Sequence, residues 1–358
     1  MNKILIIVVC CLLFVVCCLA GSYFFIDKEI RTPFKTEGEE IVFEVKEGDG
    51  VKEIARNLEK IGLIKNNFYF LFQAFKTRKE KEVLAGNYCL SPKMSISEIL
   101  ETLTTEEKLV PSFVKLTFPE GWTIKKIEER LKTKGLIEEG DILKFTIKDF
   151  KKNYPFLIDA PDKTSLEGYL FPDTYFFHCS SPEILCKEGK GEIQKCGKSD
   201  QRTIIEKFLS NFDEKLTSDL RNKIQEQHKT IFEVITMASI LEKEVNTKED
   251  REIVSGIFWK RLKGEKPLQS CATIAYILGV DKWRYSFEDT RVESPYNTYL
   301  NKDLPPAPIS NPGLESIQAA ISPKRTDYNY FLTDPKTGKT IFAKTIEEHN
   351  KNKNLYFQ

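Results

Sequence analysis

The pattern of apolar and polar positions changes repeatedly along the first part of the chain. Residues 4–25 carry no charged side chain, and about 20 predominantly apolar residues suffice for a helix to cross a membrane. Residues 26–40 are polar and charged, which is typical of a linker. Residues 41–48 then alternate apolar and polar side chains as a half-buried strand does, and residues 49–62 follow helical spacing. The pattern predicts a membrane-length segment followed by a small α+β element.

This strand–helix unit occurs a second time. The segment "EGDGVKEIARNLEKIGLI", which begins at Glu47, aligns without a gap with "EGWTIKKIEERLKTKGLI", which begins at Glu120. Both segments follow a strand-like run and end in Gly-Leu-Ile, where a glycine is a frequent helix cap. Two copies are too few for a solenoid, so the repeat predicts two small α+β modules. The alternative is that two strand–turn–helix units resemble each other by chance.

Helix and strand signals continue through the rest of the chain. "FYFLFQAF" predicts a buried helix and "LAGNYCL" a strand, and a Ser-x-x-Glu capping box from Ser95 to Glu98 opens another helix. The segment "KTIFEVITMASILEKEV" has the strongest helix pattern, with Thr230 and Glu233 as its capping box. Together these signals predict an α+β protein.

Length and charge narrow the class of protein. The chain has 358 residues, which is enough for about two domains plus a tail. Its 54 Lys and Arg balance 53 Asp and Glu, which argues against nucleic acid as a partner. Residues 4–25 exceed the usual apolar core of a signal peptide and "CLAGS" is a poor cleavage site, so we favour an uncleaved anchor over a cleaved signal. Because residues 1–3 are too short for a cytoplasmic domain, we expect the remaining chain outside the cytoplasmic membrane.

The cysteines suggest a cross-linked loop. A polar stretch at 178–200 is expected to be a surface insertion, and it contains Cys179, Cys186 and Cys196. In an exported protein two of these three could pair, and the alternatives are free thiols or a metal site. Cys89 and Cys271 are isolated in the sequence. Three scattered histidines and no Cys-x₂-Cys pair make a metal site the weakest interpretation, and no metal is expected.

Two carboxylates end the strongest helix, and their neighbours differ. The residues three and four positions before Glu244 are Leu241 and Ile240, whereas those before Glu242 are a serine and an alanine. Apolar surroundings raise the pKa of a carboxyl group, and a protonated carboxylic acid is what glycosidic bond cleavage needs. This pattern indicates Glu244 as a general acid and Glu242 as a solvated helix residue. The alternative is a helix end whose carboxylates are both solvated or paired with lysine.

Four ordered blocks carry a family resemblance. "LEGYLFPDTY", "MASILEKEV", "YNTY" with "LPPAPISNPG", and "ISPKRTDYNYF" resemble the signatures of the MltG/YceG-like endolytic murein transglycosylases, over about residues 41–350. The resemblance implies a lytic transglycosylase, without a cofactor, that cleaves the MurNAc-GlcNAc β-1,4 bond within nascent peptidoglycan glycan strands. It leaves 1,6-anhydro-MurNAc ends, and peptidoglycan synthases are its expected partners. The family's catalytic glutamate corresponds to Glu244.

The resemblance also implies substrate-binding residues. Glu167 is expected to orient substrate or catalyst, and its alternative is a buried structural ion pair. Asp173 follows a proline and is expected to cap a turn. Cys271 stands where relatives usually have Asp, which puts a polar role at that position in doubt. The other expected substrate-binding residues are Gln269, Thr273, Tyr296, Asn297 and Thr298.

The predicted architecture is an N-terminal transmembrane helix, a small LysM-like α+β module and a mixed α/β catalytic domain. Its expected parts are a cytoplasmic tail at 1–3, the anchor at 4–25, a linker at 26–40, the module at 41–110, the catalytic domain at 111–350 with the insertion at 178–200, and a tail at 351–358. The end, "NLYFQ", resembles a tag remnant, although a native origin stays open. We expect a single-pass protein of the cytoplasmic membrane with its catalytic region in the periplasm or its equivalent. The rival functions are a non-catalytic peptidoglycan-binding protein and a hydrolytic muramidase.

Overall fold

The computed structural model describes residues 2–187, 189–280, 282 and 285–356. The chain divides into two compact units. The first contains residues 1–114 and 178–197, and the second contains residues 115–177 and 198–358. Met1 of the expected cytoplasmic tail and residues 357–358 of the expected C-terminal tail lie outside the described residues.

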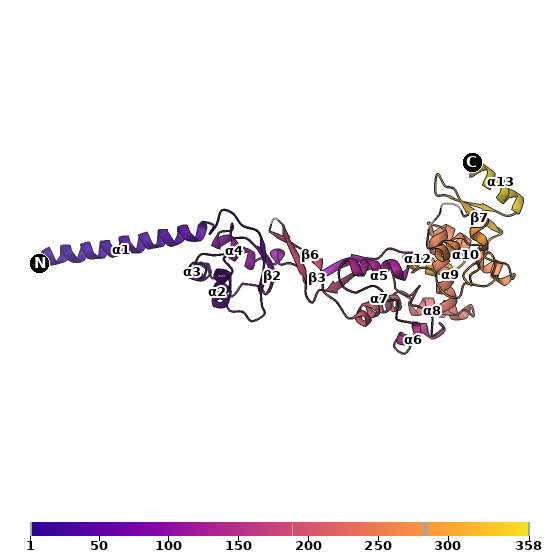
Figure 1. Ribbon diagram of the computed structural model, residues 1–358, viewed down its shortest axis with the longest axis horizontal. Coiled ribbons are helices and arrows are strands. Elements are labelled where there is room, and N and C mark those ends of the chain that lie inside the picture. The colour runs from indigo at the N-terminus through magenta and orange to yellow at the C-terminus, as the bar shows by residue number, and fades with distance from the viewer. Residues whose placement is uncertain (1, 188, 281, 283–284, 357–358) are drawn as a thin grey trace. The chain divides into compact units, whose positions relative to one another are not determined.

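The first unit begins with one long helix, α1 (Asn2–Arg31), drawn in indigo in Figure 1. Its part from Ile7 to Arg31 is long and apolar enough to cross a membrane. The helix continues six residues past the expected end at Phe25, so the first part of the expected linker is helical instead. The reason is packing and charge: Ile30 is buried in the core of the first unit, and Lys65 pairs with Glu29 of the helix at 3.1 Å.

A small α+β module follows α1, and its elements match the predicted ones. They are β1 (Ile41–Val45), α2 (Val51–Lys60), α3 (Asn67–Thr77), β2 (Gly86–Leu90), α4 (Ile96–Leu103) and the 3₁₀ turn η1 (Glu106–Lys108). β1 and β2 pair antiparallel, with Ile41 opposite Leu90 and Val45 opposite Gly86. The capping box of Ser95 and Glu98 is confirmed at the start of α4. The core of this module is formed by buried residues that include Ile54, Leu58, Phe70, Tyr88 and Leu100.

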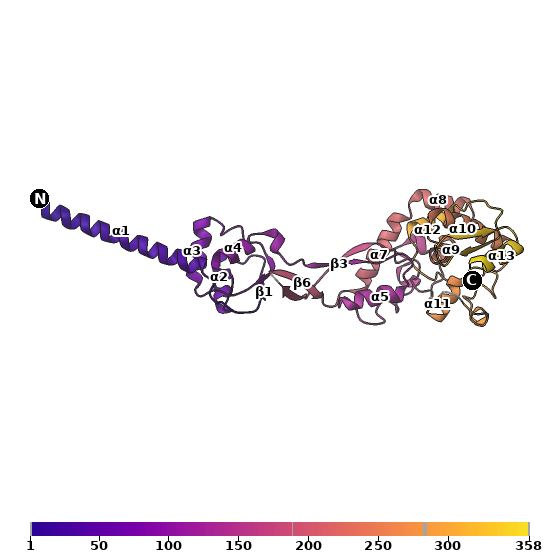
Figure 2. The same ribbon diagram turned by 90° about the horizontal axis from the view of Figure 1, so that it is seen from above.

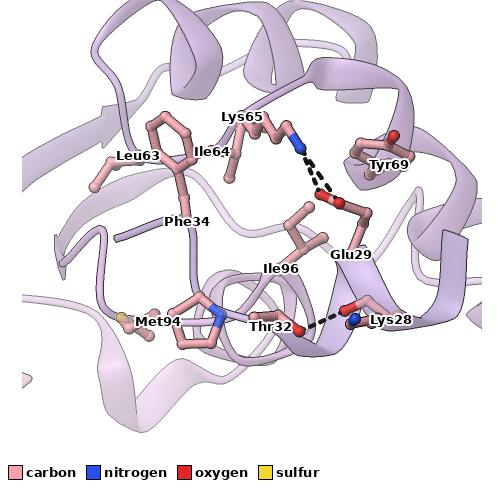
Figure 3. Close-up of a pocket in the computed structure, with 11 residues that line it drawn as sticks. Lys28, Glu29, Thr32, Phe34, Leu63, Ile64, Lys65, Tyr69, Met94 and Ile96 are labelled. Carbon is pink, nitrogen blue, oxygen red and sulfur yellow. Dashed lines mark hydrogen bonds and ion pairs between the residues drawn. The ribbon is translucent and has the colours of Figure 1, made fainter. Parts of the chain in front are cut away.

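A cavity of about 290 Å³ lies in the first unit, between the last turn of α1 and the loop after α2. Figure 3 shows the Lys65 ammonium group pointing toward the Glu29 carboxylate, with Leu63 and Ile64 on the same loop. The residues that line the cavity all belong to the first unit. None of these lining residues is among the expected catalytic or substrate-binding residues.

The cysteine-bearing stretch forms a β-hairpin that belongs to the first unit. Its antiparallel strands are β5 (Glu183–Lys187) and β6 (Lys190–Lys195). A disulfide between Cys179 and Cys196 joins the two ends of the hairpin, so one of the pairings open among the three cysteines is present. Cys89, expected to be isolated, instead forms a disulfide with Cys186. The hairpin is therefore cross-linked to β2 of the α+β module.

The second unit contains most of the helices. Its strands and helices are β3 (Phe113–Thr117), α5 (Ile124–Thr133), α6 (Ile147–Phe150), η2 (Pro155–Leu157), β4 (Thr174–His178), α7 (Gln201–Lys215), α8 (Ser218–Glu226), α9 (Ile231–Glu244), α10 (Lys248–Lys263), α11 (Cys271–Leu278), η3 (Asp289–Arg291), α12 (Leu314–Ile321), β7 (Tyr330–Thr333), β8 (Thr340–Ala343) and α13 (Ile346–Tyr356). β3 pairs with β4, of which Phe113, Val114 and His178 are counted with the first unit, and β7 pairs antiparallel with β8. The mixed α+β class is confirmed, with an apolar N-terminal helix that could span a membrane.

The two copies of the repeat have the same local structure. Each is a strand, a short loop and a helix of ten residues, namely β1 with α2 and β3 with α5. Gly48 and Gly121 occupy equivalent positions before the helix and have φ of 90° and 73°. Gly62 and Gly135 follow the helix, with φ of 76° and 67°. Since residues with a Cβ rarely adopt these angles, the repeated glycines reflect a repeated backbone path.

The core of the second unit supports the helix that carries the two carboxylates. α9 and α10 both pack against α12, and α8 packs against both α9 and α12. These helices lie together in both views (Figures 1 and 2). Elsewhere in this unit, aromatic rings pack around Phe208 of α7, which lies 5.0 Å from Phe118 and 4.3 Å from Tyr175 between ring centroids. The end of α9 is held mainly by its packing against α10, α11 and α12.

The expected C-terminal tail is partly structured. Residues 351–356 belong to α13, which packs on β7 and β8. On the same helix, the ring of His349 stacks on that of Tyr330, with centroids 5.3 Å apart. The last helix is thus attached to the β7–β8 hairpin.

Candidate active site

Helix α9 carries both candidate carboxylates in its last turn. Its N-terminus has the predicted capping box, in which the Glu233 N–H donates to the Thr230 hydroxyl and the Glu233 carboxylate accepts from the Thr230 N–H. Every residue from Val234 to Leu241 is buried, including the polar Ser239. The middle of the helix is therefore enclosed by protein, whereas Glu233 and Lys243 near its ends are exposed. A carboxylate at its end must find its partners among groups from other segments.

Glu244 lies against the N-terminus of α11. Its Oε1 accepts a hydrogen bond from the Ser270 hydroxyl and one from the Ala272 N–H, whose nitrogen is 3.1 Å away. Burial raises the pKa of the Glu244 carboxyl, while these donors act in the opposite direction. The direction of the shift agrees with the one expected from the sequence. A carboxyl with a raised pKa keeps its proton to a higher pH than an exposed carboxyl does, and it can give that proton to a ligand.

A network of buried hydroxyl groups supports the residues behind Glu244. The Thr298 Oγ1 accepts from the Ser270 N–H at 3.0 Å and lies 2.9 Å from the Thr273 Oγ1. The Thr273 hydroxyl donates to the Ser270 carbonyl at 2.8 Å. The Gln269 N–H donates to the Thr298 carbonyl, and Gln269 has a φ of 54° although it is not glycine. Thus three of the expected substrate-binding residues organise the loop that holds Glu244.

Other polar groups lie around the same carboxylate. The thiol of Cys271 is exposed and lies 3.1 Å from the Tyr299 hydroxyl. The guanidinium group of Arg261 on α10 donates to the Asn329 carbonyl at 2.8 Å. The Arg261 charge lowers the pKa of Glu244, opposing burial, which is the largest effect and raises it. Glu244 in turn raises the pKa of Tyr299, although burial is again the main cause.

The prediction that Glu242 is solvated is wrong. Its side chain is only 5% exposed, and its Oε1 lies 3.1 Å from the Arg251 Nη2. Its Oε2 accepts a hydrogen bond from the Gly313 N–H at 2.9 Å. Arg251 also pairs with Glu315, at 2.8 Å. Glu242 is the centre of a buried ion pair because α9 is enclosed by neighbouring segments, including the loop before α12.

The Glu167 carboxylate links the start of α5 to the loop before α12 through hydrogen bonds. Both of its carboxylate oxygens accept from the Ile124 N–H, at 3.0 and 3.1 Å, at the start of α5. The Asn311 Nδ2 donates to the same carboxylate at 2.9 Å, and the Asn311 Oδ1 accepts from the N–H groups of Gly168 and Leu170. Burial raises the pKa of Glu167 to about 8. These partners are neutral, so the expected alternative of a buried ion pair does not describe them.

The remaining expected residues shape the loop before α12. Asn297 is buried, and its amide donates to the carbonyls of Thr290 and Val292. The Tyr296 ring lies 5.0 Å from that of Tyr276 on α11, between centroids. Burial raises the pKa of Tyr276, and Glu167 adds to the same effect.

Asp173 lies at the start of β4, where its Oδ1 accepts from the N–H of Thr174. Its Oδ2 accepts from the Asn211 amide at 3.0 Å. This arrangement resembles the expected turn-capping role. It ties the strand to α7.

The structure thus brings some expected residues together and adds others. Gln269, Thr273 and Thr298 surround the loop that binds Glu244, whereas the contacts of Glu167 are with Ile124 and Asn311. Sequence reasoning missed several groups that bind or face the carboxylates, namely Ser270, Ala272, Asn311, Arg251, Arg261 and Tyr299. Ser270 and Asn311 lie within conspicuous sequence blocks, but their roles depend on partners far along the chain.

The fold and site define a class: an α+β protein, with an apolar N-terminal helix, that holds a partly buried acid at a helix end. The model of the YceG-like family matches residues 43–355. The chain belongs to the YceG-like family, which confirms the resemblance carried by the sequence blocks.

Curated relatives and a solved structure agree with this membership. The chain is 33% identical over 332 residues to the endolytic murein transglycosylase of Streptococcus pneumoniae serotype 2 (strain D39 / NCTC 7466), with 86% of the chain and 57% of that relative covered. It is 31% identical over 348 residues to the endolytic murein transglycosylase of Bacillus subtilis (strain 168), with 94% of the chain and 90% of the relative covered. The chain thus spans 57% of the pneumococcal protein's length.

The structural comparison covers the chain to a similar extent. A crystal structure of a YceG-like protein from Listeria monocytogenes matches with a TM-score of 0.56 and 33% sequence identity. The match covers 88% of this chain and all of that one. The similarity therefore includes most of both units.

Proposed function

We propose that this protein is an endolytic murein transglycosylase. It cleaves the β-1,4 bond between MurNAc and GlcNAc within peptidoglycan glycan strands and leaves 1,6-anhydro-MurNAc ends. The observation that carries the proposal is the partly buried Glu244 carboxyl, raised in pKa and held by Ser270 and Ala272, in a chain of the YceG-like family. The names of the relatives support the substrate class.

The proposed reaction uses one principal carboxyl group. Protonated Glu244 donates its proton to the glycosidic oxygen as the bond to the anomeric carbon breaks. The resulting carboxylate accepts the proton of the muramyl C6 hydroxyl, whose oxygen forms the new bond to the anomeric carbon. No water is consumed, so the product carries an internal 1,6-anhydro bridge. A hydrolytic muramidase would instead need a second carboxylate to activate water or form a covalent intermediate.

The other expected residues receive roles in substrate binding. Gln269 is exposed next to the Glu244 loop, and the paired rings of Tyr296 and Tyr276 are half-buried. Aromatic faces of this kind stack on sugar rings, and Gln269 can form hydrogen bonds with hydroxyl groups. The remaining expected residues fix the positions of the loops that face the substrate. They are Glu167, Asn297, Thr273 and Thr298.

Features of the first unit support glycan binding and membrane anchoring as further parts of the proposed function. Its strand–helix–helix–strand order, with β1 antiparallel to β2, supports a LysM-like module that binds glycan strands. Helix α1 would anchor the protein in the cytoplasmic membrane, with both units on the outer side, where synthases that extend the strands would be its partners. A reporter that works only after export, fused behind residue 358, should be active, and activity of a strictly cytoplasmic reporter would contradict this orientation.

The decisive experiment compares Glu244→Gln with the unaltered full-length protein in detergent. Purified glycan strands are incubated with each and the products are identified by mass spectrometry. Glutamine keeps the shape of the side chain but cannot donate the proton, so anhydro ends should fall by about 10²–10⁴-fold while strand binding persists. Products with reducing, hydrated ends would favour a muramidase, and no cleavage by the unaltered protein would favour a non-catalytic binding protein.

A further inference from the structure

One oxygen of the Glu244 carboxyl group accepts two hydrogen bonds. Oε1 accepts from both the Ser270 hydroxyl and the Ala272 N–H, and the Cys271 N–H is a further donor to the carboxyl group. A carboxyl oxygen has two lone pairs in the plane of the group, so the two donors to Oε1 use its acceptor capacity. A proton on Oε1 would displace the Ala272 N–H or turn the Ser270 hydroxyl from a donor into an acceptor. A proton on Oε2 keeps both hydrogen bonds, so Oε2 is the favoured site.

The Ser270 backbone is fixed by a closed set of hydrogen bonds. Its N–H donates to the Thr298 hydroxyl oxygen, and its carbonyl accepts from the Thr273 hydroxyl. Because the Thr273 proton is directed at that carbonyl, the contact between the two threonine hydroxyls requires Thr298 to donate to Thr273. All three residues are at most 1% exposed, so water does not compete for these positions. Ser270 can therefore present its hydroxyl to Glu244 in one defined position.

We propose that Ser270 is a positioning residue that, together with the Ala272 N–H, keeps Oε1 as an acceptor and directs the transferable proton of Glu244 to Oε2. The proposal rests on the acid role of Glu244 under the proposed function. It assigns Oε2 as the oxygen that must face the glycosidic oxygen of a bound strand. Substrate bound on the other side of the carboxyl group would meet an oxygen without a proton.

The groups that face Glu244 determine in which direction its pKa changes when the Ser270 hydroxyl is removed. Arg261 comes from α10, Cys271 from the first turn of α11, and Tyr299 from the loop before α12. Of these, Arg261 favours the ionised carboxylate, and a donated hydroxyl does the same. Removing the Ser270 hydroxyl leaves Arg261 in place but takes away one stabilising donor. The pKa of Glu244 should then rise further, so the protonated form should persist to higher pH.

The test uses full-length protein in detergent and two readouts. The first is infrared difference spectroscopy of the carboxylic acid band, assigned to Glu244 by its loss in Glu244→Gln, which gives the titration midpoint without turnover. The second is the pH profile of kcat for the release of anhydro-muramyl ends. Ser270→Ala should move both the midpoint and the alkaline limb upward by about one pH unit. It should also lower kcat about tenfold with KM unchanged, because the proton is then shared between the two oxygens.

Matched variants separate positioning from folding. Ser270→Thr retains a hydroxyl and should restore the midpoint of the unaltered protein, while Ser218→Ala, on the exposed start of α8, should change neither readout. Thermal melting shows whether Ser270→Ala is folded. If it is folded but its infrared titration midpoint and the alkaline limb of its kcat profile are both unchanged, the proposal is overturned. An infrared midpoint that shifts in Ser270→Ala while the unaltered protein releases no anhydro ends would support the positioning of the proton and refute the proposed function.

Discussion

The ion pair between Glu242 and Arg251 gives the clearest test of how the end of α9 is stabilised. Glu242→Gln keeps the volume of the side chain and an oxygen that can accept from the Gly313 N–H. It removes the negative charge that faces the Arg251 guanidinium group, whose side chain is 8% exposed. Arg251 keeps Glu315 as a partner, but that side chain is 54% exposed and offers a solvated charge. The substitution therefore leaves a buried cation with incomplete compensation.

The magnitude follows from the cost of breaking a buried pair. Removal of one partner costs about 3–5 kcal/mol, and we expect about 3 kcal/mol because Glu315 remains. For a unit of roughly 150–250 residues, each kcal/mol lowers the melting temperature by about 2–4 °C, so the second unit should melt about 6–12 °C lower. The control Glu315→Gln removes the exposed partner and should cost no more than about 1 kcal/mol.

Calorimetry of the two variants measures these shifts, and product analysis measures turnover below the melting transition. Glu242→Gln should still form anhydro ends at a reduced rate, whereas Glu244→Gln should be stable and inactive. A Glu242→Gln variant with an unchanged melting temperature and no turnover would refute the reasoning, since Glu242 would then act in the chemistry rather than in the frame.

Two further predictions concern groups away from this pair. The pKa of Glu167 is raised from 4.5 to about 8, so its contribution to the stability of the second unit is full below pH 4.5 and is lost as pH rises through 8. Melting temperatures measured across that interval should fall in the unaltered protein and stay flatter in Glu167→Gln, and parallel curves would contradict the assignment. Cys89→Ser with Cys186→Ser opens a disulfide with a sequence separation of 97, whereas Cys179→Ser with Cys196→Ser opens one of 17. Chain entropy predicts that the first pair costs about 1.5 kcal/mol more in unfolding free energy, measured by denaturant titration, and equal or reversed costs would contradict it.

Local features of the fold could be predicted because their causes are local. The capping boxes at Ser95 and Thr230 are formed by residues three positions apart, and the repeated glycines define turns within one segment. The residue at which α1 ends could not be predicted from the local sequence. The charged residues after Phe25 indicate a linker by composition, but Ile30 is buried and Glu29 is paired with Lys65, and both facts depend on the module that follows.

The cysteine-bearing hairpin also could not be placed from its local sequence. Its polar, glycine-containing sequence predicted a surface insertion of the catalytic domain, and the sequence gives no indication that its strands belong with the first unit. Cys89 is isolated in the sequence, because no other cysteine lies near it in the chain. Disulfide connectivity cannot be deduced from sequence alone, since it depends on which strands meet in space. Here β2 and the hairpin meet, so Cys186 pairs with Cys89 rather than with a neighbour in its own segment.

The two glutamates show how an assignment made from sequence can rest on an incomplete argument. Residues two positions apart point to opposite sides of a helix, and the sequence favours Glu244 because its neighbours on the helix are apolar. However, the neighbours of Glu242, which are Ala238 and Ser239, are equally buried, because every residue from Val234 to Leu241 is buried. What distinguishes the carboxylates is the partner each receives from elsewhere: Glu242 meets the charge of Arg251, while Glu244 meets a hydroxyl and a peptide N–H. An opposite charge in direct contact stabilises an ionised carboxylate, whereas at Glu244 burial outweighs the two neutral donors and the charge of Arg261 and favours the acid. The tertiary partners, rather than the helical face, therefore make Glu244 the candidate acid and Glu242 part of the frame.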